Sequence, residues 1–227
     1  MTSTNRDAVF GASLLELSGT PTLQAAAGRI FYFPANIAVA DDTVFTQSSG
    51  SSVIRNDVEV AGELVITNGS VNVWGGSLFP KLNATAPWKL TVQNGGTFFM
   101  RRIDSRLAVP VDLALSGTGK IQMANNDSGY YNRSVVIAHS FTRDGVAQAK
   151  GRYAGNTAYL AGLAPSSIVV CHVWTGAGDG TSWNDPANWD GNAVPPSGDN
   201  TCVDLSRAAG GTITLNDNVT LTFSGFL

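Results

Sequence analysis

Apolar and polar residues alternate over short stretches along most of this chain, and glycine or asparagine separates the stretches. Alternation with a period of two places apolar side chains on one face of a β-strand, whereas a helix requires a period of about 3.6 residues. This pattern predicts strands at 29–33, before Pro34, and at 37–39. A run of β-branched residues at 134–138 predicts a buried strand. The chain is therefore expected to be all-β.

Three segments share one arrangement, in which a short alternating strand, a tight turn and a second short strand follow one another. The segments are 64–73, 90–99 and 113–123, with turns at Asn68-Gly69, Asn94-Gly95 and Ser116-Gly117. The turns are roughly 22 to 26 residues apart, the length of one coil of a stacked β architecture. An Asn-Gly step can close an antiparallel hairpin or form a corner between two faces of a coil. The regular recurrence favours a right-handed β-solenoid, similar to a β-helix.

The first fifty residues differ from these repeats. The residues at 13–17 and 22–28 predict short helical turns, the second ended by Gly28. We expect 1–50 to be a short irregular N-terminal segment that acts as a cap or docking element. The solenoid repeats are expected at 51–170, and a tryptophan-rich block at 171–227 is expected to start a further β segment.

Composition and charge narrow the classes of function. The chain has 25 glycines and only three glutamates, and 14% of its residues are charged, which argues against long helices with charged outer faces. The net charge of −3 and the scattered basic residues argue against nucleic acid as a partner. No run approaches the roughly 20 apolar residues of a membrane span.

The two ends of the sequence bear on its setting. Residues 1–7 lack the basic stretch and apolar core of a secretory signal. Either the chain assembles inside the cell that makes it, as virion proteins do, or it is a piece of a longer secreted chain. Residues 221–227 are still strand-like, so the last edge is expected to need a partner or a continuation. We expect self-association, or assembly with other structural proteins, on an extracellular surface or in a virion particle.

Two segments resemble a known family. Residues 144–153 (DGVAQAKGRY) resemble the G-V-x-Q-x-x-G-x-Y step that closes autotransporter-associated β-strand repeats in very large bacterial surface proteins. Residues 174–189 (WTGAGDGTSWNDPANW) look like the linker that opens a new repeat block in the same proteins, and the similarity continues through 194–199. The resemblance covers about 63–223 and does not account for the first fifty residues. It implies a stalk or passenger structure without catalytic activity.

The tryptophan-rich block holds the candidate binding residues. Trp174, Trp183 and Trp189 could form a sugar-stacking platform for a surface glycan, or a buried clamp that holds an irregular loop on the end of a sheet. We favour the clamp. Aspartates in this segment could supply oxygen ligands to a structural calcium ion, with Asp179 and Asp185 as the leading candidates. Asp190 and Asp199 lie nearby, but the spacing fits no known calcium loop and aspartate also forms turns. No other cofactor is expected.

No catalytic residue is assigned. Cys171 and Cys202 are a candidate disulfide, and two cysteines and two histidines are too few for a convincing zinc site. Cys171 and His172 are neighbours that would point to opposite faces of a strand. Glu59 and Glu63, four residues apart in a strand-like stretch, would share a face as a glycosidase pair might require, although solvent-facing carboxylates are commoner.

We therefore predict a non-enzymatic structural scaffold. It is either a phage virion decoration or fibre protein, or a fragment of a bacterial surface protein. A carbohydrate-binding or adhesin module is the first alternative, and a polysaccharide-degrading β-helix enzyme is the second.

Overall fold

The computed structural model describes residues 2–3, 8–9, 14–25, 30–33, 36–39, 44–54, 58–60, 62–73, 88–100, 106–123, 135–155, 157–161, 167–198, 201–205 and 212–215. The chain divides into two compact units. Unit 1 comprises residues 1–148 and 153–168, and unit 2 comprises residues 149–152 and 169–227.

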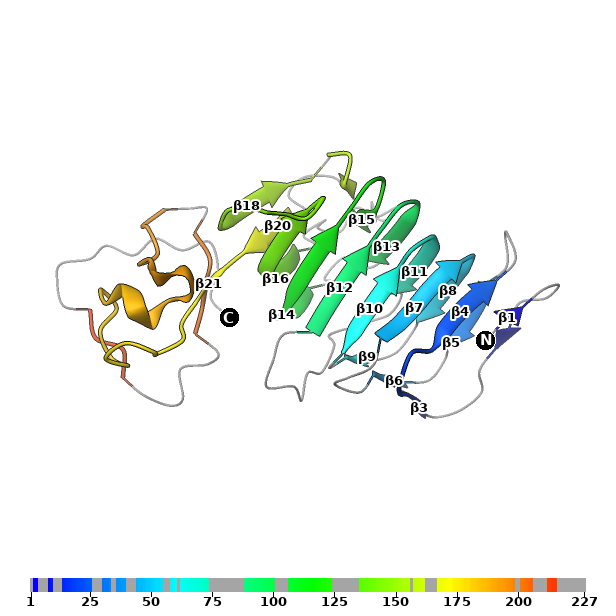
Figure 1. The fold of residues 1–227 in the computed structure, drawn as a ribbon, viewed down its shortest axis with the longest axis horizontal. Helices are drawn as coiled ribbons and strands as arrows, with labels where there is room; N and C mark the ends of the chain where they lie inside the picture. Colours follow the sequence, from blue (N-terminus) through cyan, green and yellow to red (C-terminus); the bar gives the residue numbers. More distant parts are fainter. Residues whose placement is uncertain are drawn as a thin grey trace, which may run out of the picture. The chain divides into compact units, whose positions relative to one another are not determined.

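The strands of unit 1 lie in two large sheets and a small one (Figure 1). Sheet A contains, in spatial order, β1 (Thr2–Ser3), β4 (Thr22–Ala25), β7 (Val44–Ser49), β10 (Glu63–Ile66), β12 (Trp88–Val92), β14 (Arg106–Leu115), β16 (Val135–Arg143), β20 (Ser167–Val170) and β18 (Gly151–Ala154), with β17 (Val146–Ala147) beside β16. Sheet B contains β19 (Leu160–Ala161), β15 (Lys120–Met123), β13 (Gly96–Met100), β11 (Gly69–Val73), β8 (Ser51–Ile54), β5 (Ile30–Phe33) and β2 (Ala8–Val9). Sheet C contains β3 (Leu14–Leu17), β6 (Asn36–Val39) and β9 (Val58–Val60).

Up to β9 the chain visits sheets A, B and C in turn, and from β10 to β16 it alternates between sheets A and B. In sheet A the strand pairs from β1 to β16 are all parallel. In sheet B the strand pairs from β2 to β19 are also all parallel. The Asn68-Gly69 turn joins β10 of sheet A to β11 of sheet B, and Asn94-Gly95 joins β12 to β13 in the same way. The hairpin alternative is therefore wrong for these turns, because the strands that they connect belong to different sheets.

Apolar side chains stack in rows inside unit 1. One row in sheet A follows the register Leu64, Leu90, Leu113 and Phe141, and one in sheet B follows Val71, Phe98, Ile121 and Leu160. All of these side chains are buried. Burying each is worth about 1.5–3 kcal/mol relative to leaving it exposed. The alternation seen in the sequence is thus the pattern of one inward-facing and one outward-facing row on each strand.

Glycine at the corners allows neighbouring strands to approach closely. A Cβ on Gly96 would lie 2.4 Å from the carbonyl oxygen of Ile66. A Cβ on Gly69, which has φ +83°, would lie 2.0 Å from the carbonyl oxygen of Gly50. Any other residue at these two positions would have to displace the backbone of the neighbouring strand.

The buried rows contain polar residues at β7 and β8. Gln47 pairs in register with Ile66, and Ser52 with Val71, and both polar side chains are fully buried. The Ser52 hydroxyl donates to Gln47 Oε1, and Gln47 Nε2 donates to the carbonyl oxygen of Ser49. These hydrogen bonds offset the cost of burying an amide and a hydroxyl among apolar residues.

The first fifty residues contribute strands to the same sheets. The strands predicted at 29–33 and 37–39 are confirmed as β5 and β6. The helical turns predicted at 13–17 and 22–28 are wrong, because 14–17 and 22–25 form strands that pair with β6 and β7. Long-range pairing overrides local helix propensity here. The domain limits at 50 and 170, and a capping or docking role for 1–50, stay predictions.

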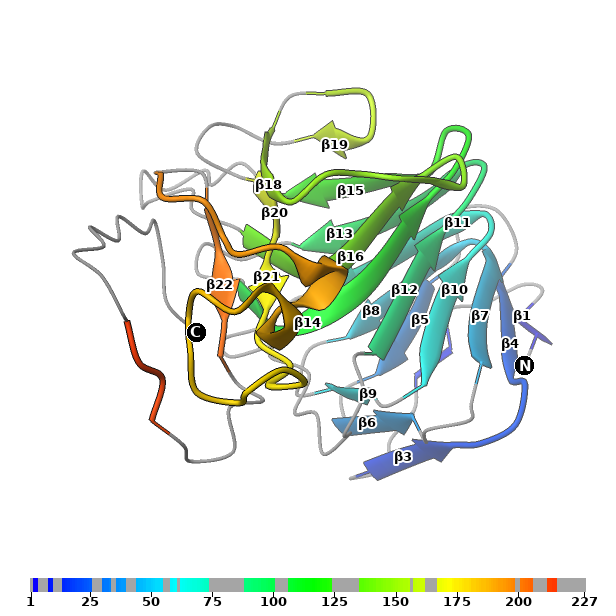
Figure 2. The same ribbon diagram turned by 60° about the vertical axis from the view of Figure 1, so that its left-hand side comes forward.

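Unit 2 is built around a two-stranded parallel sheet and two short 3₁₀ helices. Its strands are β21 (His172–Val173) and β22 (Val203–Asp204), and its helices are η1 (Pro186–Asn188) and η2 (Asp190–Asn192). Figure 2 shows η1 and η2 in orange beside β21 and β22. Asp185 caps η1 by accepting from the backbone N–H of Ala187, and Pro186 occupies the first helical position.

Candidate functional site

The three predicted tryptophans lie in the core of unit 2. Trp174, Trp183 and Trp189 are 2%, 4% and 1% exposed and pack with Val203. The ring of Trp189 meets those of Trp174 and Trp183 edge to face, at centroid distances of 5.0 and 4.6 Å. The indole N–H of Trp189 donates to the carbonyl oxygen of Trp183 at 2.8 Å. These rings are almost fully buried, which favours the clamp over the sugar-stacking platform.

Asn188 organises the loop between Trp174 and Trp189. Its side chain is fully buried, and Oδ1 accepts from the backbone N–H groups of Gly178 and Gly180, both at 2.9 Å. Its Nδ2 donates to Asp179 Oδ1 at 2.7 Å and to the carbonyl oxygen of Ser182 at 2.9 Å. All four hydrogen-bonding positions of this amide are therefore used. Sequence reasoning assigned Asn188 no role, because nothing local distinguishes it from other turn residues.

The two candidate calcium ligands accept backbone hydrogen bonds. Asp179 Oδ1 accepts from Thr181 at 2.9 Å and from Ser182 at 2.7 Å, and Asp185 Oδ2 accepts from the backbone N–H of Asp179 at 3.0 Å. The hydrogen bonds from Ser182, Thr181 and Asn188 hold the pKa of Asp179 below its usual value. This geometry favours the turn-forming interpretation of both carboxylates.

Among the described residues, no three histidine, cysteine, aspartate or glutamate side chains come together as a metal site requires. Asp190, the third aspartate of the segment, is engaged elsewhere in unit 2, and Asp199 lies outside the described residues.

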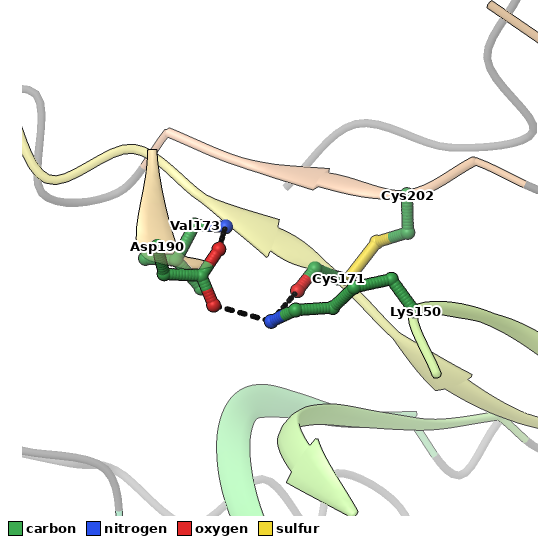
Figure 3. The surroundings of a disulfide bond; sticks show 5 residues. All are labelled: Lys150, Cys171, Val173, Asp190 and Cys202. Carbon is green, nitrogen blue, oxygen red and sulfur yellow. Dashed lines mark hydrogen bonds and ion pairs between the residues drawn. A yellow bond between two sulfur atoms is a disulfide. The ribbon is translucent and has the colours of Figure 1, made fainter. Parts of the chain in front are cut away.

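Figure 3 shows a polar cluster around the disulfide in unit 2. The structure joins Cys171 and Cys202, which directly precede β21 and β22. Lys150 Nζ donates to the carbonyl oxygen of Cys171 at 2.7 Å and forms an ion pair with Asp190. The other oxygen of Asp190 accepts from the backbone N–H of Val173 at 2.7 Å. The cluster therefore ties residue 150 and helix η2 to the first strand of the small sheet.

His172 lies beside this cluster. Burial is the main cause that lowers its pKa, the positive charge of Lys150 lowers it further, and Asp190 acts in the opposite direction. Its Nδ1 is buried and has no hydrogen-bond partner. Because the Cys171 sulfur is bonded to Cys202, it cannot act as a thiolate paired with His172.

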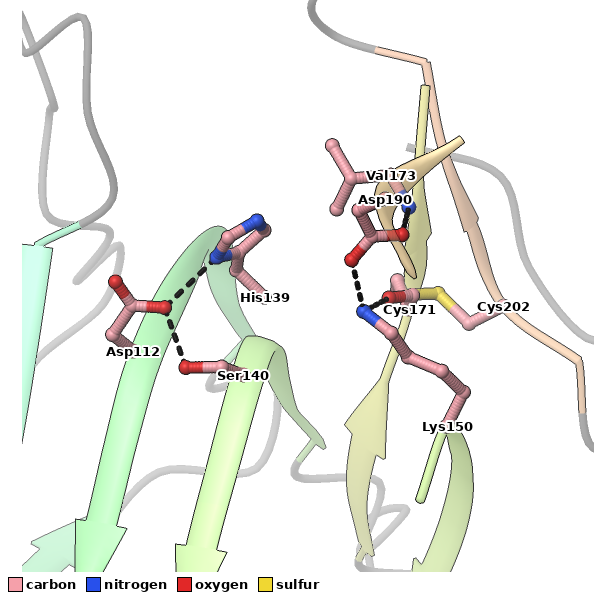
Figure 4. Close-up of polar contacts among 8 residues, drawn as sticks. All are labelled: Asp112, His139, Ser140, Lys150, Cys171, Val173, Asp190 and Cys202. Carbon is pink, nitrogen blue, oxygen red and sulfur yellow. Dashed lines mark hydrogen bonds and ion pairs between the residues drawn. A yellow bond between two sulfur atoms is a disulfide. The ribbon is translucent and has the colours of Figure 1, made fainter. Parts of the chain in front are cut away.

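A second polar cluster lies in unit 1, on β14 and β16 (Figure 4). Asp112 Oδ1 lies 2.8 Å from His139 Nδ1 and accepts from Ser140 Oγ at 2.6 Å. Val111 pairs with Ala138 and Asp112 with Ser140, so His139 is the extra residue of a β-bulge. Consecutive residues of a regular strand point to opposite faces, and the bulge instead brings both side chains to one carboxylate.

Burial of Asp112 works to raise the pKa of its carboxyl group, but other interactions outweigh it. Hydrogen bonds from His139 and Ser140, and the charges of His139 and Lys89, hold this pKa below its usual value. Lys89 pairs in register with Asp112 on one side and with Glu63 on the other. Acidic and basic residues therefore alternate along this row of sheet A.

The Asp112 cluster has the residue types of a nucleophilic triad but a different geometry. In such a triad the imidazole lies between the serine and the carboxylate and takes the serine proton. Here Ser140 donates directly to the carboxylate, so this contact does not activate its oxygen as a nucleophile. Sequence reasoning missed Asp112 and Ser140, because the bulge depends on pairing between distant strands.

The suggested glutamate pair is also corrected. Glu59 belongs to β9 of sheet C and Glu63 to β10 of sheet A, so the chain changes sheets between them. Glu63 Oε1 instead accepts from Thr91 Oγ1 at 2.6 Å. The two residues do not share a strand face as the spacing predicted.

Comparisons with protein-family models, curated proteins and solved structures find no match for this chain. Within the described residues, no helix has the length and apolar character needed to cross a lipid bilayer.

Proposed function

We propose that the chain is a non-enzymatic structural scaffold, with unit 1 built as a right-handed β-solenoid. The observation that carries the proposal is the register of its parallel strands. In-register partners are 19 residues apart at Ser51 and Ser70 and 28 apart at Asp112 and Ser140. The chain visits sheets A, B and C in turn up to β9, and sheets A and B in turn from β10 to β16. This is the repeating, nearest-neighbour construction typical of solenoids.

The architecture suits a load-bearing role. Each strand contacts mainly its two neighbours in the same sheet, so such a body becomes longer as coils are added and does not depend on a single central core. The rows of buried leucine, valine and isoleucine side chains join successive strands of one sheet. A chain built in this way serves as a rod or platform that displays other elements.

Unit 2 fits the proposal as a structural joint. It has its own tryptophan core, a disulfide and a loop whose polar groups are paired through Asn188. The resemblance of 174–189 to a linker between repeat blocks supports the same role. The family relationship to autotransporter-associated repeat proteins is part of this proposal.

We propose an exterior location, either in a phage virion as a decoration or fibre protein or on a bacterial surface. The partners would be other copies of the chain or structural proteins of the same assembly. Mass spectrometry of purified virions and of cell-surface fractions from the producing organism tests this directly. Enrichment in either fraction is expected, and recovery with the cytoplasmic enzymes alone would contradict the proposal.

A glycan array and an assay with acidic polysaccharides test the two alternatives. The carbohydrate-binding alternative depends on sugar stacking by Trp174, Trp183 and Trp189, and these three side chains lie in the core of unit 2. We expect no glycan binding that depends on them and no polysaccharide turnover. Specific turnover of an acidic polysaccharide by the purified chain would show that the protein is an enzyme and not a scaffold.

A further inference from the structure

The sequence contains two Asn-Gly pairs, and they lie at equivalent corners of unit 1. Asn68-Gly69 connects β10 to β11, and Asn94-Gly95 connects β12 to β13. Both asparagines are exposed. An asparagine followed by glycine can cyclise. The backbone nitrogen of the glycine attacks the side-chain amide carbon of the asparagine, and the lack of a Cβ on glycine leaves little steric hindrance to this attack. The two corners share this chemistry but differ in the contacts of the reacting nitrogen.

At the first corner the reacting groups face each other. The backbone N–H of Gly69 donates to Asn68 Oδ1 at 2.9 Å. The amide carbon of Asn68 is one bond from this oxygen, so the nitrogen that would attack lies next to its target.

At the second corner the nitrogen is held by another coil. The backbone N–H of Gly95 donates to Thr118 Oγ1 at 2.8 Å. The Asn94 amide extends over Gly117, where its Oδ1 is 1.8 Å from the position that a Cβ would occupy. Attack by the Gly95 nitrogen would therefore require the hydrogen bond to Thr118 to break and the Asn94 side chain to turn back.

We propose that Asn68 is a site of spontaneous deamidation in the folded chain and that Thr118 protects Asn94. The Gly69 nitrogen, as it loses its proton to solvent base, forms a bond to Asn68 Cγ. The bond from Cγ to the side-chain nitrogen breaks, and that nitrogen leaves as ammonia after taking up a proton. Water then opens the resulting succinimide ring at either carbonyl, which gives aspartate or isoaspartate.

The modification would change the corner where neighbouring coils meet. It adds a negative charge, and the isoaspartate product adds one carbon to the backbone. Asn68 Oδ1 is 3.0 Å from the position of a Cβ on Gly95, so the altered side chain faces the next corner directly. Deamidation at Asn68 therefore acts on the stacking of two successive coils.

Peptide mapping by mass spectrometry tests the proposal, with fragmentation that separates isoaspartate from aspartate. The whole chain is incubated in mildly alkaline buffer, once folded and once in denaturant. In the folded chain Asn68 should convert about fivefold faster than Asn94, the factor associated with one hydrogen bond. In denaturant the two rates should be comparable. Equal rates in the folded chain, or faster conversion of Asn94, would overturn the proposal.

Two variants test the protection by Thr118. Thr118→Val removes the acceptor with little change in shape and should raise the Asn94 rate in the folded chain about fivefold. Thr118→Ser keeps a hydroxyl group and should leave the rate unchanged. Circular dichroism establishes that both variants are folded. If Thr118→Val leaves Asn94 as slow as before, the assignment of Thr118 is wrong.

Discussion

Asp112 Oδ1 lies 2.8 Å from His139 Nδ1, although the two residues are 27 positions apart and His139 is the extra residue of a β-bulge. A carboxylate only accepts hydrogen bonds, so Nδ1 carries the proton in this contact. Ser140 donates to the same oxygen. One carboxylate thus joins two consecutive residues of the neighbouring strand.

The Asp112 contact predicts a pH dependence of stability. The pKa of Asp112 is lowered in the folded chain, where burial opposes ionisation but the contacts with His139 and Ser140 outweigh it. Its contribution is therefore fully present above the unfolded pKa of about 3.9 and is lost as the pH falls through the lower folded value. Asp112→Asn should lower the Tm by a few degrees at neutral pH and by less in acid.

Thermal melts of both proteins across this pH range measure the effect. Ser140→Ala is the matched control, since it removes one hydrogen bond and keeps the charge. Because the Ser140 hydrogen bond is one of the contacts that lower the Asp112 pKa, the Tm deficit of this control should be smaller than that of Asp112→Asn at neutral pH and should also shrink in acid. An Asp112→Asn deficit of the same size at neutral and acidic pH would show that the charge does not matter.

The tryptophan cluster predicts a loss of stability rather than a loss of binding. Trp183→Ala leaves a cavity beside Trp189 in the core of unit 2 and should cost about 3–5 kcal/mol. Denaturant unfolding followed by tryptophan fluorescence measures it. Leu215→Ala, at a side chain that is 43% exposed, is the control and should change stability by less than about 0.5 kcal/mol. A stable Trp183→Ala protein that had lost glycan binding would instead support the sugar-stacking platform.

Asn188 predicts a local effect on hydrogen exchange. Asn188→Ala leaves the N–H groups of Gly178 and Gly180 without their acceptor and should cost about 0.5–1.5 kcal/mol for each hydrogen bond lost. Both amides should exchange faster with solvent. Asn188→Asp keeps an acceptor but cannot donate to Asp179, so the two carboxylates repel each other. Unchanged protection of both amides in the two variants would show that Asn188 does not stabilise the loop.

Calcium should have little effect on the folded chain. Asp179 and Asp185 direct their oxygens to backbone N–H groups of the same loop. The Tm should therefore be the same with excess calcium and with a chelator. A calcium-dependent rise in the Tm that is lost in Asp185→Asn would establish a structural ion at this loop.

The disulfide predicts a redox-dependent stability of unit 2. Cys171 and Cys202 are separated by 31 positions, and closing a loop of that size contributes about 3–4 kcal/mol in the chain-entropy description. The double variant Cys171→Ser/Cys202→Ser should lose this amount, and a reductant should destabilise the original chain but not the variant. If the original chain without reductant is no more stable than the double variant, the bond contributes nothing.

The sequence predicted the strands and corners of the repeats because these depend on local information. Alternating residues at 64–73 and 90–99 have one buried face, and an Asn-Gly step marks each corner. The helical turns expected at 13–17 and 22–28 failed because their pairing partners lie in distant strands, which no local propensity reveals.

The candidate sites were predicted less well than the strands. The tryptophans were found by type, but their burial depends on how Val203 and the loops close around them. The Asp112 cluster depends on a single shift in register between β14 and β16, and nothing near His139 in the sequence indicates that shift. A contact of this kind is set by pairing across 27 positions.

The variable separation between paired residues has a consequence for how such a chain can evolve. Partners are 19 positions apart at Ser51 and Ser70 and 28 apart at Asp112 and Ser140, yet each pair lies side by side in its sheet. Insertions and deletions outside the strands leave these neighbours in place. Natural variants can therefore gain or lose surface segments between the paired strands, and present new outer features, while the inner rows of side chains stay unchanged.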